Sequence, residues 1–525
     1  MRDTDLDSCV DESAQNILWQ VFGHRHFRHL QQEVIAHVVN GEDALVLMPT
    51  GGGKSLCYQI PALVRSGVAV VVSPLIALMR QQVESLRSMG IEAASLDSLQ
   101  SVQAIAQTER ALSRGQIKLL YVSPERLSSQ RLLDLLRRVP VSLFAIDEAH
   151  CVSQWGHDFR PEYMALSVLG RLWPDVPRLA LTASATQETA REILARLEMP
   201  GARVFQTSFD RPNLDYQIVV KDDVRRQLTA FIRARQTAAG QPESGIVYCA
   251  SRARTDQVAG WLQEAGFMAL SYHAGLDHEQ RLSRQKHFIE QPGCIMVATI
   301  AFGMGVDKPD VRFVAHVDVP RSMEGYFQET GRAGRDGDQA VAWMCWGLDD
   351  VARAHRWPDM QASEQRIKVQ LQAYEEMLAF CASRTCRRQT LLAHFGETIA
   401  PCGHCDNCQV SETLVDVTIP AQKLLSAIYR LWRERDQRFG AGHVIDILRG
   451  KMTSRVEQLD HQSLSVFGIG RDWTDKQWRR LLLQLLGERL LVMDDEGYRT
   501  LALTPSSVAV LRSERRLHMR ASDLA

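Results

Sequence analysis

The sequence lacks a long apolar run, a basic N-terminal segment and a strong excess of charge of either sign. No apolar stretch approaches the ~18 residues that a membrane span requires, so no part of the chain is expected in a bilayer. The first residues, MRDTDLDSCV, are acidic where a signal peptide is basic, which predicts a cytoplasmic protein. The net charge of −1 excludes a whole-chain electrostatic footprint for nucleic acid, so any such binding must come from local patches.

The length and the cysteines predict several domains and a metal site rather than disulfides. A chain of 525 residues is too long for one core, and about three or four domains are expected. Eleven cysteines in a reducing compartment are thiols or metal ligands, and five of them crowd into residues 381–408. Residues 421–525 hold 18 Lys and Arg against 13 Asp and Glu, which makes this segment a candidate basic patch.

The first two hundred residues alternate short apolar runs with amphipathic stretches. This pattern predicts an α/β fold with a parallel sheet covered on both faces. A polar cluster follows each predicted strand, and open α/β sheets bind ligands at that end of their strands. The predicted strands are residues 44–48, 68–72, 119–122, 143–146 and 179–181.

The α/β pattern restarts near Phe209. Two similar sheets joined near SFDRPN predict a cleft between two α/β domains. Past about Asp350 the strands are expected to end, and the chain continues as helices that finish in two β-like runs around an acidic turn, LLVMDDEGYRTLALT. The strands predicted in the second sheet are residues 246–249, 269–272, 295–298 and 313–317.

The segment MPTGGGKS, residues 48–55, has what a phosphate-binding loop needs. It follows a predicted buried strand, its glycines let backbone N–H groups converge on phosphate oxygens, and Lys54 adds a cation. Ser55 can ligate magnesium. The strict G-x4-G-K-[ST] pattern would require Gly at Met48, so the match is incomplete, and a Gly-rich turn without function is the alternative.

Two carboxylates and two arginines complete a candidate hydrolytic site. Asp147 and Glu148 follow another predicted strand, and alone such a pair is more often a solvated strand end. Together with Lys54, one carboxylate can hold magnesium and the other can orient or deprotonate the attacking water. In QETGRAGRDG, Arg332 and Arg335 lie three apart, hence on one face if helical. An arginine that reaches the γ-phosphate from a second domain would couple hydrolysis to movement, and surface charge is the alternative.

Eight stretches, in this order, resemble the RecQ family of superfamily 2 DNA helicases, and the resemblance covers nearly the entire chain. They are MPTGGGKS, SPLIALM, DEAHCVSQWGHDFRPEY, LTASAT, SFDRPN, YHAGL, ATIAFGMG and QETGRAGRDG. The resemblance implies ATP-driven 3′ to 5′ unwinding of DNA in repair and recombination. It also implies two RecA-like domains, a helical zinc-binding domain and a winged helix. We place these at residues 1–208, 209–349, 350–411 and 412–513, followed by a basic tail at 514–525.

The resemblance also implies roles in the ATP site. Lys54 would bind the β/γ-phosphates, Ser55 and Asp147 would bind magnesium, and Glu148 would act on the attacking water. Arg335 would be the arginine finger, with Arg332 beside it. The other nucleotide contacts would be Thr50, Gly51, Gly52 and Gly53 in the phosphate loop, and Arg28 and Gln31 near adenine.

The adenine segment FGHRHFRHLQQE departs from the family pattern. The family usually has Tyr where His24 stands, and Pro-Gly where His29 and Leu30 stand. Adenine preference is expected to persist through Gln31, while the shape of the loop is not predicted.

The loop DEAHCVSQWGHDFRPEY resembles the element that senses single-stranded DNA in this family. Stacking of a base on an aromatic side chain needs no particular sequence and is worth about 1 to 3 kcal/mol per base. Because the loop directly follows Glu148, bound DNA could move this carboxylate. Packing of the aromatics between domains is the alternative. The candidate contacts are Trp155, His157, Phe159 and Arg160.

The segment TDKQWRRLLLQLLGERLL is a candidate recognition helix. Lys476, Arg479 and Arg480 are available for phosphates, and a solvated basic face is the alternative. The hairpin that follows matches the position of the family's wing, where Tyr498 could stack on the terminal base pair although three acidic residues beside it would repel the backbone. The family often carries a further module, HRDC, which is not expected here because only a short basic segment remains.

A cluster of cysteines predicts a metal site. Cys402, Cys405 and Cys408 form C-x2-C-x2-C, and four thiolates suit tetrahedral structural zinc. This spacing could instead hold an iron–sulfur cluster, but the resemblance favours zinc. Cys381 and Cys386 compete for the fourth position, and Cys386 is chosen because the family has its ligand at TCRR. A closed four-sulfur site leaves no position for substrate, so a stabilising role is expected.

The expected cofactors are therefore ATP, Mg²⁺ and Zn²⁺. The expected partners are single-stranded and 3′-tailed duplex DNA, with a single-stranded-DNA-binding protein as a further candidate, and a cytoplasmic monomer is expected. A DNA-stimulated translocase or strand-remodelling ATPase that separates no strands is the alternative function, because an acidic hairpin is a poor wedge. A binding scaffold with a silent ATPase would not need Lys54, Asp147, Glu148 and Arg335 together.

Overall fold

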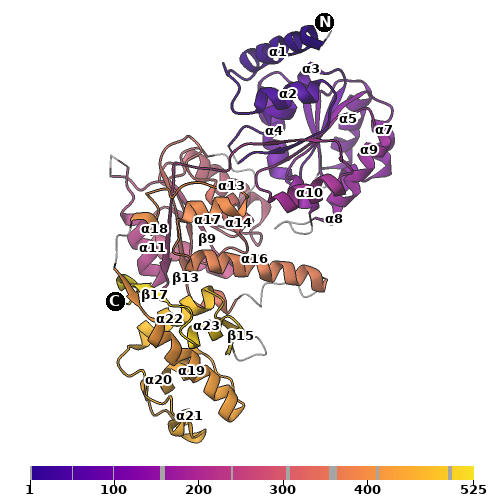
Figure 1. Cartoon of the computed structure of the whole chain (residues 1–525). Coiled ribbons are helices and arrows are strands. Elements are labelled where there is room, and N and C mark those ends of the chain that lie inside the picture. The colour runs from indigo at the N-terminus through magenta and orange to yellow at the C-terminus, as the bar shows by residue number, and fades with distance from the viewer. Residues whose placement is uncertain are drawn as a thin grey trace.

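The structure is a computed structural model, and it shows two parallel sheets followed by helical segments (Figure 1). In the part of the chain that it describes, none of the helices has both the length and the apolar character of a membrane span. The described residues are 3–49, 51–97, 100–153, 160–237, 240–302, 308–353, 363–409, 413–494 and 499–524.

The first sheet has seven strands in the order β3-β4-β2-β5-β6-β1-β7, and every pairing is parallel. Its interior strands are buried because helices cover both faces, so Leu45 and Val46 of β1 belong to apolar cores on opposite sides. The strands are β1 (Ala44–Leu47), β2 (Val68–Val72), β3 (Ala93–Leu96), β4 (Leu119–Val122), β5 (Val141–Ile146), β6 (Arg178–Thr182) and β7 (Arg203–Gln206). The helices are α1 (Asp3–Gln20), α2 (Gln31–Val39), α3 (Leu56–Val64), α4 (Ile76–Ser88), α5 (Val102–Ser113), α6 (Pro124–Leu127), α7 (Gln130–Leu136), α8 (Pro161–Met164), α9 (Val168–Leu172) and α10 (Gln187–Arg196).

The second sheet has six parallel strands in the order β10-β11-β9-β12-β13-β8. The strands are β8 (Leu214–Val220), β9 (Gly245–Tyr248), β10 (Ala269–Tyr272), β11 (Ile295–Ala298), β12 (Phe313–His316) and β13 (Ala340–Trp346). The helices are α11 (Val224–Arg233), α12 (Arg252–Glu264), α13 (His278–Glu290), α14 (Met323–Thr330) and α15 (Leu348–Val351).

The rest of the chain is mainly helical, with two small antiparallel pairs, β14 with β17 and β15 with β16. The strands are β14 (Leu414–Asp416), β15 (Leu491–Asp494), β16 (Thr500–Leu503) and β17 (His518–Arg520). The helices are α16 (Glu364–Ala382), α17 (Arg387–His394), α18 (Asp406–Gln409), α19 (Thr418–Arg435), α20 (Ala441–Arg449), α21 (Ser454–Gln458), α22 (Asp475–Gly487), α23 (Ser507–Leu511) and α24 (Ala521–Leu524).

The nine strands predicted for the two sheets are all present, with ends shifted by two residues at most. Four strands of these sheets were not predicted. Three of them, β3, β7 and β8, form sheet edges and do not need a continuous apolar run. The fourth, β13, is as apolar as the predicted strands, and nothing in its sequence explains why it was not predicted. The expectation that strands end near Asp350, except for the last two β-like runs, is wrong at β14 and β17, which are short and pair across a long sequence separation.

Candidate active site and metal centre

Three neighbouring strands of the first sheet bring the candidate ATP residues to one edge. In the sheet, β5, β6 and β1 lie side by side and run parallel. Asp147 follows β5, Thr182 ends β6, and Lys54 follows β1 after a short loop. The topology therefore brings the phosphate loop and the carboxylates together at the carboxyl ends of the strands, as predicted.

Two glycines and one glutamine shape the phosphate loop. Gly51 and Gly53 have φ angles of +85° and +79°, which L side chains rarely adopt. The buried Gln31 amide donates from Nε2 to the carbonyls of Gly53 (3.0 Å) and Gly52 (3.4 Å). Its Oε1 accepts from the backbone N–H of Arg28 at 2.8 Å. The segment expected at adenine therefore holds the phosphate loop directly.

Lys54 is bound by its own loop. Its ammonium donates to the carbonyls of Met48 (3.0 Å) and Pro49 (3.3 Å). Burial lowers the pKa of Lys54, while the nearby Glu148 and Asp147 carboxylates oppose that change. The cation thus has neutral partners that a phosphate group could replace.

Asp147 and Glu148 form a crowded pair of carboxylates. Burial, reinforced by Glu148, raises the pKa of Asp147 to about 7, although Lys54 opposes the shift. A divalent cation at Asp147 would supply the positive charge that this pair lacks, and the Ser55 hydroxyl at the start of α3 offers a second oxygen ligand. The residues therefore fit magnesium, which would neutralise charge on a bound phosphate chain.

Glu148 is positioned by residues that the sequence analysis did not select. Its φ of +49° is uncommon for a side-chain-bearing residue and costs about 1 to 3 kcal/mol, so the surrounding contacts impose it. Glu148 Oε2 lies 3.3 Å from His150 Nδ1, and this nitrogen lies 2.8 Å from Thr182 Oγ1. His150 is the last residue of DEAH, and Thr182 is the second residue of LTASAT. These two motifs could therefore have identified both residues.

The two arginines of QETGRAGRDG come from the second sheet's domain. Helix α14 ends at Thr330, and Arg332 and Arg335 lie in the turns that follow, so the two arginines are not helical and their spacing does not place them on one helix face. The Cγ of Arg335 lies 3.8 Å from the position that a Cβ on Gly51 would take. Arg332 is buried near Tyr248, and burial raises the pKa of Tyr248 to about 12 although the charge of Arg332 opposes that change. The structure therefore brings Arg335 of one domain to the phosphate loop of the other.

The aromatic-loop predictions are only partly covered by the structure. Trp155, His157 and Phe159 lie outside the described residues, as do Thr50 of the phosphate loop and Tyr498 of the hairpin. Arg160 is described, and its Nη1 donates to the carbonyl of Pro74 at 3.3 Å, near the end of β2. Arg160 thus lies at the same edge of the sheet as the carboxylates.

The candidate recognition helix is α22, which begins with a capping box at Thr474. Lys476 and Arg479 are about half exposed and form ion pairs with Asp222 (3.5 Å) and Asp475 (2.5 Å). The guanidinium of Arg480 instead donates to backbone carbonyls at Ser522 (3.0 Å) and Asp523 (2.7 Å) in α24. Arg480 therefore fastens the C-terminal helix, which is a structural role that the sequence analysis did not predict.

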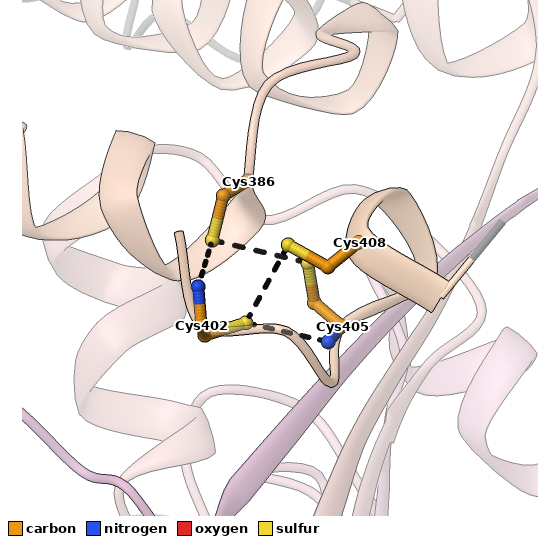
Figure 2. Close-up of side chains that lie close together, drawn as sticks. All are labelled: Cys386, Cys402, Cys405 and Cys408. Carbon is orange, nitrogen blue, oxygen red and sulfur yellow. Dashed lines mark hydrogen bonds between the residues drawn. The ribbon is translucent and has the colours of Figure 1, made fainter. Parts of the chain in front are cut away.

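Four cysteine sulfurs converge as predicted. The side chains of Cys386, Cys402, Cys405 and Cys408 point toward one another, and their Sγ atoms all lie within 4.8 Å (Figure 2). The Cys402–Cys408 and Cys386–Cys405 sulfurs are 3.9 and 4.0 Å apart. A zinc tetrahedron with bonds of ~2.3 Å has edges of ~3.8 Å, so the spacing fits. Cys381 is buried outside this group, whereas Cys386, the predicted fourth ligand, belongs to it.

Backbone N–H groups favour the thiolate at this site. The N–H groups of Cys402 (3.2 Å) and Gln389 (3.5 Å) point at the Sγ of Cys386. Burial raises the pKa of Cys386, but these N–H groups and the Cys402 and Cys408 thiols together outweigh burial and lower the pKa to about 7. The donor set is therefore suited to a structural zinc with all four positions filled by protein.

Comparisons with known proteins agree with this geometry. Four family models match the chain in sequence order: DEAD/DEAH box helicase (28–193), Helicase conserved C-terminal domain (225–337), RecQ zinc-binding (348–409) and RQC domain (411–524). Among solved structures, the DEAD-box helicase Mss116 bound to ssRNA and UDP-BeF has a TM-score of 0.56 at 18% identity, covering 72% of this chain and 85% of that one. At this identity the likeness shows the fold alone.

Relatives among curated proteins are much closer in sequence. The ATP-dependent DNA helicase RecQ of Pasteurella multocida is 43% identical over 97% of this chain and 80% of its own. The ATP-dependent DNA helicase RecQ of Bacillus subtilis is 37% identical over 95% of this chain and 84% of its own. Because this identity spans both motor domains, the zinc-binding segment and the RQC domain, the chain belongs to the RecQ family of ATP-dependent DNA helicases.

Proposed function

We propose that this helicase moves 3′ to 5′ and separates duplex DNA, driven by hydrolysis of ATP between its two parallel-sheet domains. The observation that carries the proposal is the approach of Arg335 from the second domain to Gly51 and Lys54 of the first. ATP bound there would contact both domains, so hydrolysis would weaken their contact and permit movement.

Each residue of the site has a proposed role. Lys54 neutralises the β/γ-phosphates, and Asp147 and Ser55 hold magnesium. Glu148 orients or deprotonates the attacking water, since its backbone and His150 fix the carboxylate. Arg335 stabilises the charge that develops on the transferred phosphoryl group. The adenine contact is assigned to Gln31 and Arg28.

The aromatic loop is proposed to couple DNA to hydrolysis. It follows the 3₁₀ helix η1 (Ala149–Val152), whose first residue is next to Glu148, so a displacement of the loop passes to the carboxylate. Trp155→Ala is expected to abolish stimulation of the ATPase by single-stranded DNA while basal hydrolysis remains. Full stimulation in this variant would contradict the coupling.

Four other expectations stay predictions from the sequence. They are a single-stranded-DNA-binding partner, a monomeric state, a cytoplasmic location and the domain limits given above.

The test compares duplexes that carry a 3′ tail or a 5′ tail of equal length. Strand release and ATP consumption are measured in the same tube with magnesium, at a stated moderate salt concentration because phosphate contacts are salt-dependent. Release of the 3′-tailed duplex alone is expected, and Lys54→Ala should lose both signals. Preferential release of the 5′-tailed duplex would overturn the polarity. Hydrolysis without release would favour a translocase instead.

A further inference from the structure

We infer that Arg211, in the SFDRPN segment between the two sheets, is a positioning residue for Arg335, and that the zinc-binding domain holds this segment in place. The inference rests on the proposed role of Arg335 in hydrolysis and extends it to residues that contact no nucleotide. It follows from a set of hydrogen bonds that connect three parts of the chain.

Arg211 binds the loop that carries Arg335. Its guanidinium donates to the carbonyls of Gly331 (3.1 Å), Ala333 (2.8 Å) and Gly334 (2.8 Å). These carbonyls lie in the turns after α14, outside the hydrogen-bond pattern of the helix. The guanidinium has five N–H donors in one plane and can satisfy several carbonyls at once. It therefore fixes the backbone immediately before Arg335.

Asn213 binds the same loop from its other end. Its Nδ2 donates to the carbonyls of Gly334 and Asp338, both at 2.8 Å. Its own carbonyl accepts from the backbone N–H of Ala340 at 2.9 Å. Gly334 has a φ of +58°, and a Cβ there would lie 2.5 Å from Asn213 Nδ2, so the fit is close. Both flanks of Arg335 are thus attached to SFDRPN.

The zinc-binding domain holds the SFDRPN segment through ionic contacts. Asp210, next to Arg211, forms two hydrogen bonds with the guanidinium of Arg388 in α17. Glu397 accepts from the backbone N–H of Phe209 (2.6 Å) and from Ser208 Oγ (2.7 Å). Carboxylate and guanidinium groups give the stronger class of hydrogen bond, so this end of the segment is firmly fixed.

An aromatic cluster adds an apolar connection. The buried ring of Phe209 lies 5.8 Å from Phe327 of α14 and 4.9 Å from Phe395 of the zinc-binding domain, measured between ring centroids. The rings of Phe327 and Phe395 are themselves 4.9 Å apart. One cluster therefore joins the zinc-binding domain, SFDRPN and the helix that leads to Arg335.

Loss of Arg211 should slow hydrolysis without weakening nucleotide binding. The carbonyls of Gly331 and Ala333 would lose the guanidinium donor, and Gly334 would keep only its other donors, so the loop could shift. A displacement of about 1 Å at a reacting centre can cost roughly 10²-fold in rate. The phosphate loop of the first domain would remain intact. A residue needed only for folding would instead lower the amount of active protein and leave the kcat of the folded fraction unchanged.

The experiment measures DNA-stimulated kcat and the Kd of a fluorescent ATP analogue for the full chain and its variants. Arg211→Ala is expected to lower kcat roughly 10- to 100-fold and to change Kd less than about 3-fold. Arg211→Lys should recover little, because a compact ammonium cannot reach the same carbonyls as a planar fork. The matched control is Arg225→Ala, which removes a half-exposed arginine paired with Glu264 in the same domain and should be neutral.

Arg335→Ala, measured in parallel, distinguishes the proposed role of Arg335 in hydrolysis from the positioning role of Arg211. Normal hydrolysis in that variant would overturn the proposed role of Arg335. Slow hydrolysis there, with wild-type kcat in Arg211→Ala, would overturn the positioning inference alone.

Two further variants keep the inference testable if Arg211→Ala does not fold. Asn213→Ala removes the second attachment, and Asp210→Ala removes the partner of Arg388. Each should lower kcat roughly 3- to 10-fold with zinc content unchanged, because each variant removes two hydrogen bonds that hold the segment or the loop and each bond has a modest net strength. Wild-type kcat in Asn213→Ala would overturn the attachment of the loop, and wild-type kcat in Asp210→Ala would overturn the part played by the zinc-binding domain.

Discussion

The position of the Asp147 carboxyl group lowers the folding stability of the nucleotide-free protein. Burial and the neighbouring Glu148 raise its pKa from 3.8 to about 7. Between these two values the folded chain binds more protons at this group than the unfolded chain does. The contribution of Asp147 to stability therefore falls as pH rises from about 4 to about 7.

Replacing Asp147 by a neutral residue of the same shape should therefore stabilise the empty protein. Asp147→Asn is expected to raise Tm at about pH 8 and to lose this gain as pH falls from 7 toward 4, where the wild-type group takes up a proton. Thermal unfolding without nucleotide or magnesium, followed across this pH range, tests it. Asp134→Asn, at a half-exposed carboxylate, should give no such pH-dependent gain. A lower Tm for Asp147→Asn at about pH 8 would contradict the argument.

Among single residues, the sequence predicts those that stand in a recognisable pattern of neighbouring residues. Lys54 stands in a Gly-rich turn after a strand, and the carboxylate pair follows another strand. Arg211 could not be found in this way, because its partners are backbone carbonyls some 120 residues away along the chain. Backbone carbonyls carry no side-chain signature, so only the folded structure identifies such a residue.

Within the zinc-binding segment, two nearby cysteines should behave differently. Cys386 belongs to the four-sulfur group, whereas Cys381 is a buried thiol in α16. Cys386→Ser is expected to lose zinc and to open residues 387–409 to proteases, since a structural metal site contributes folding free energy directly. Cys381→Ser should retain zinc. Metal analysis and limited proteolysis measure both effects, and equal zinc content in the two variants would contradict the ligand assignment.

The winged-helix element is attached through the end of α22. A Cβ on Gly487 would lie 2.3 Å from the Cβ of Ala382 in α16 and 3.2 Å from the ring of Trp346. Gly487→Ala should therefore cost about 1 to 3 kcal/mol by overpacking and lower the first thermal transition. Gly260→Ala in α12, where nothing lies within 4 Å of the new Cβ, should raise Tm through its better helix propensity. Shifts of the same sign in both variants would contradict this packing argument.

Interior strands other than β13 could be predicted from the sequence, whereas three of the four edge strands, β3, β7 and β8, could not. Burial is the physical reason. A strand buried on both faces must be apolar at every position, as β1 and β2 are. An edge strand such as β7 is exposed at three of its four residues, so RVFQ has no apolar pattern to detect. The order of strands, which brings Asp147, Thr182 and Lys54 together, has no counterpart in the sequence pattern either.

In the whole molecule, the zinc-binding domain contacts both motor domains. Asp406 accepts from the backbone N–H of Ile218 in the edge strand β8 at 3.2 Å, and His404 pairs with Asp215 of the same strand. On the other side, a Cβ on Gly396 would lie 3.3 Å from Gln187 Nε2 at the start of α10. The sequence predicts these domains but not their contacts, because the pairs join residues that are far apart in the chain.

One of these contacts should make the attachment of the zinc-binding domain depend on pH. His394 Nε2 in α17 lies 2.7 Å from Glu324 Oε1 in α14, the helix that leads to Arg335. Burial lowers the pKa of His394, but the hydrogen bond and charge of Glu324 outweigh burial and raise it above 6.5. A raised histidine pKa adds stability that is fully present below the unfolded value and is lost as pH rises through the folded value.

Glu324→Gln should therefore destabilise the protein most at low pH. The wild-type Tm is expected to exceed that of Glu324→Gln by the largest margin at about pH 6, and the margin should shrink by about pH 8.5 as His394 becomes neutral. Glu376→Gln is the matched control, because its carboxylate lies 3.9 Å from His394 Nδ1 and should give a smaller margin. Thermal unfolding of the three proteins across this range decides the matter. A margin that does not change with pH would mean that Glu324 acts through a neutral hydrogen bond, and the protonated histidine would then have no part in joining the two domains.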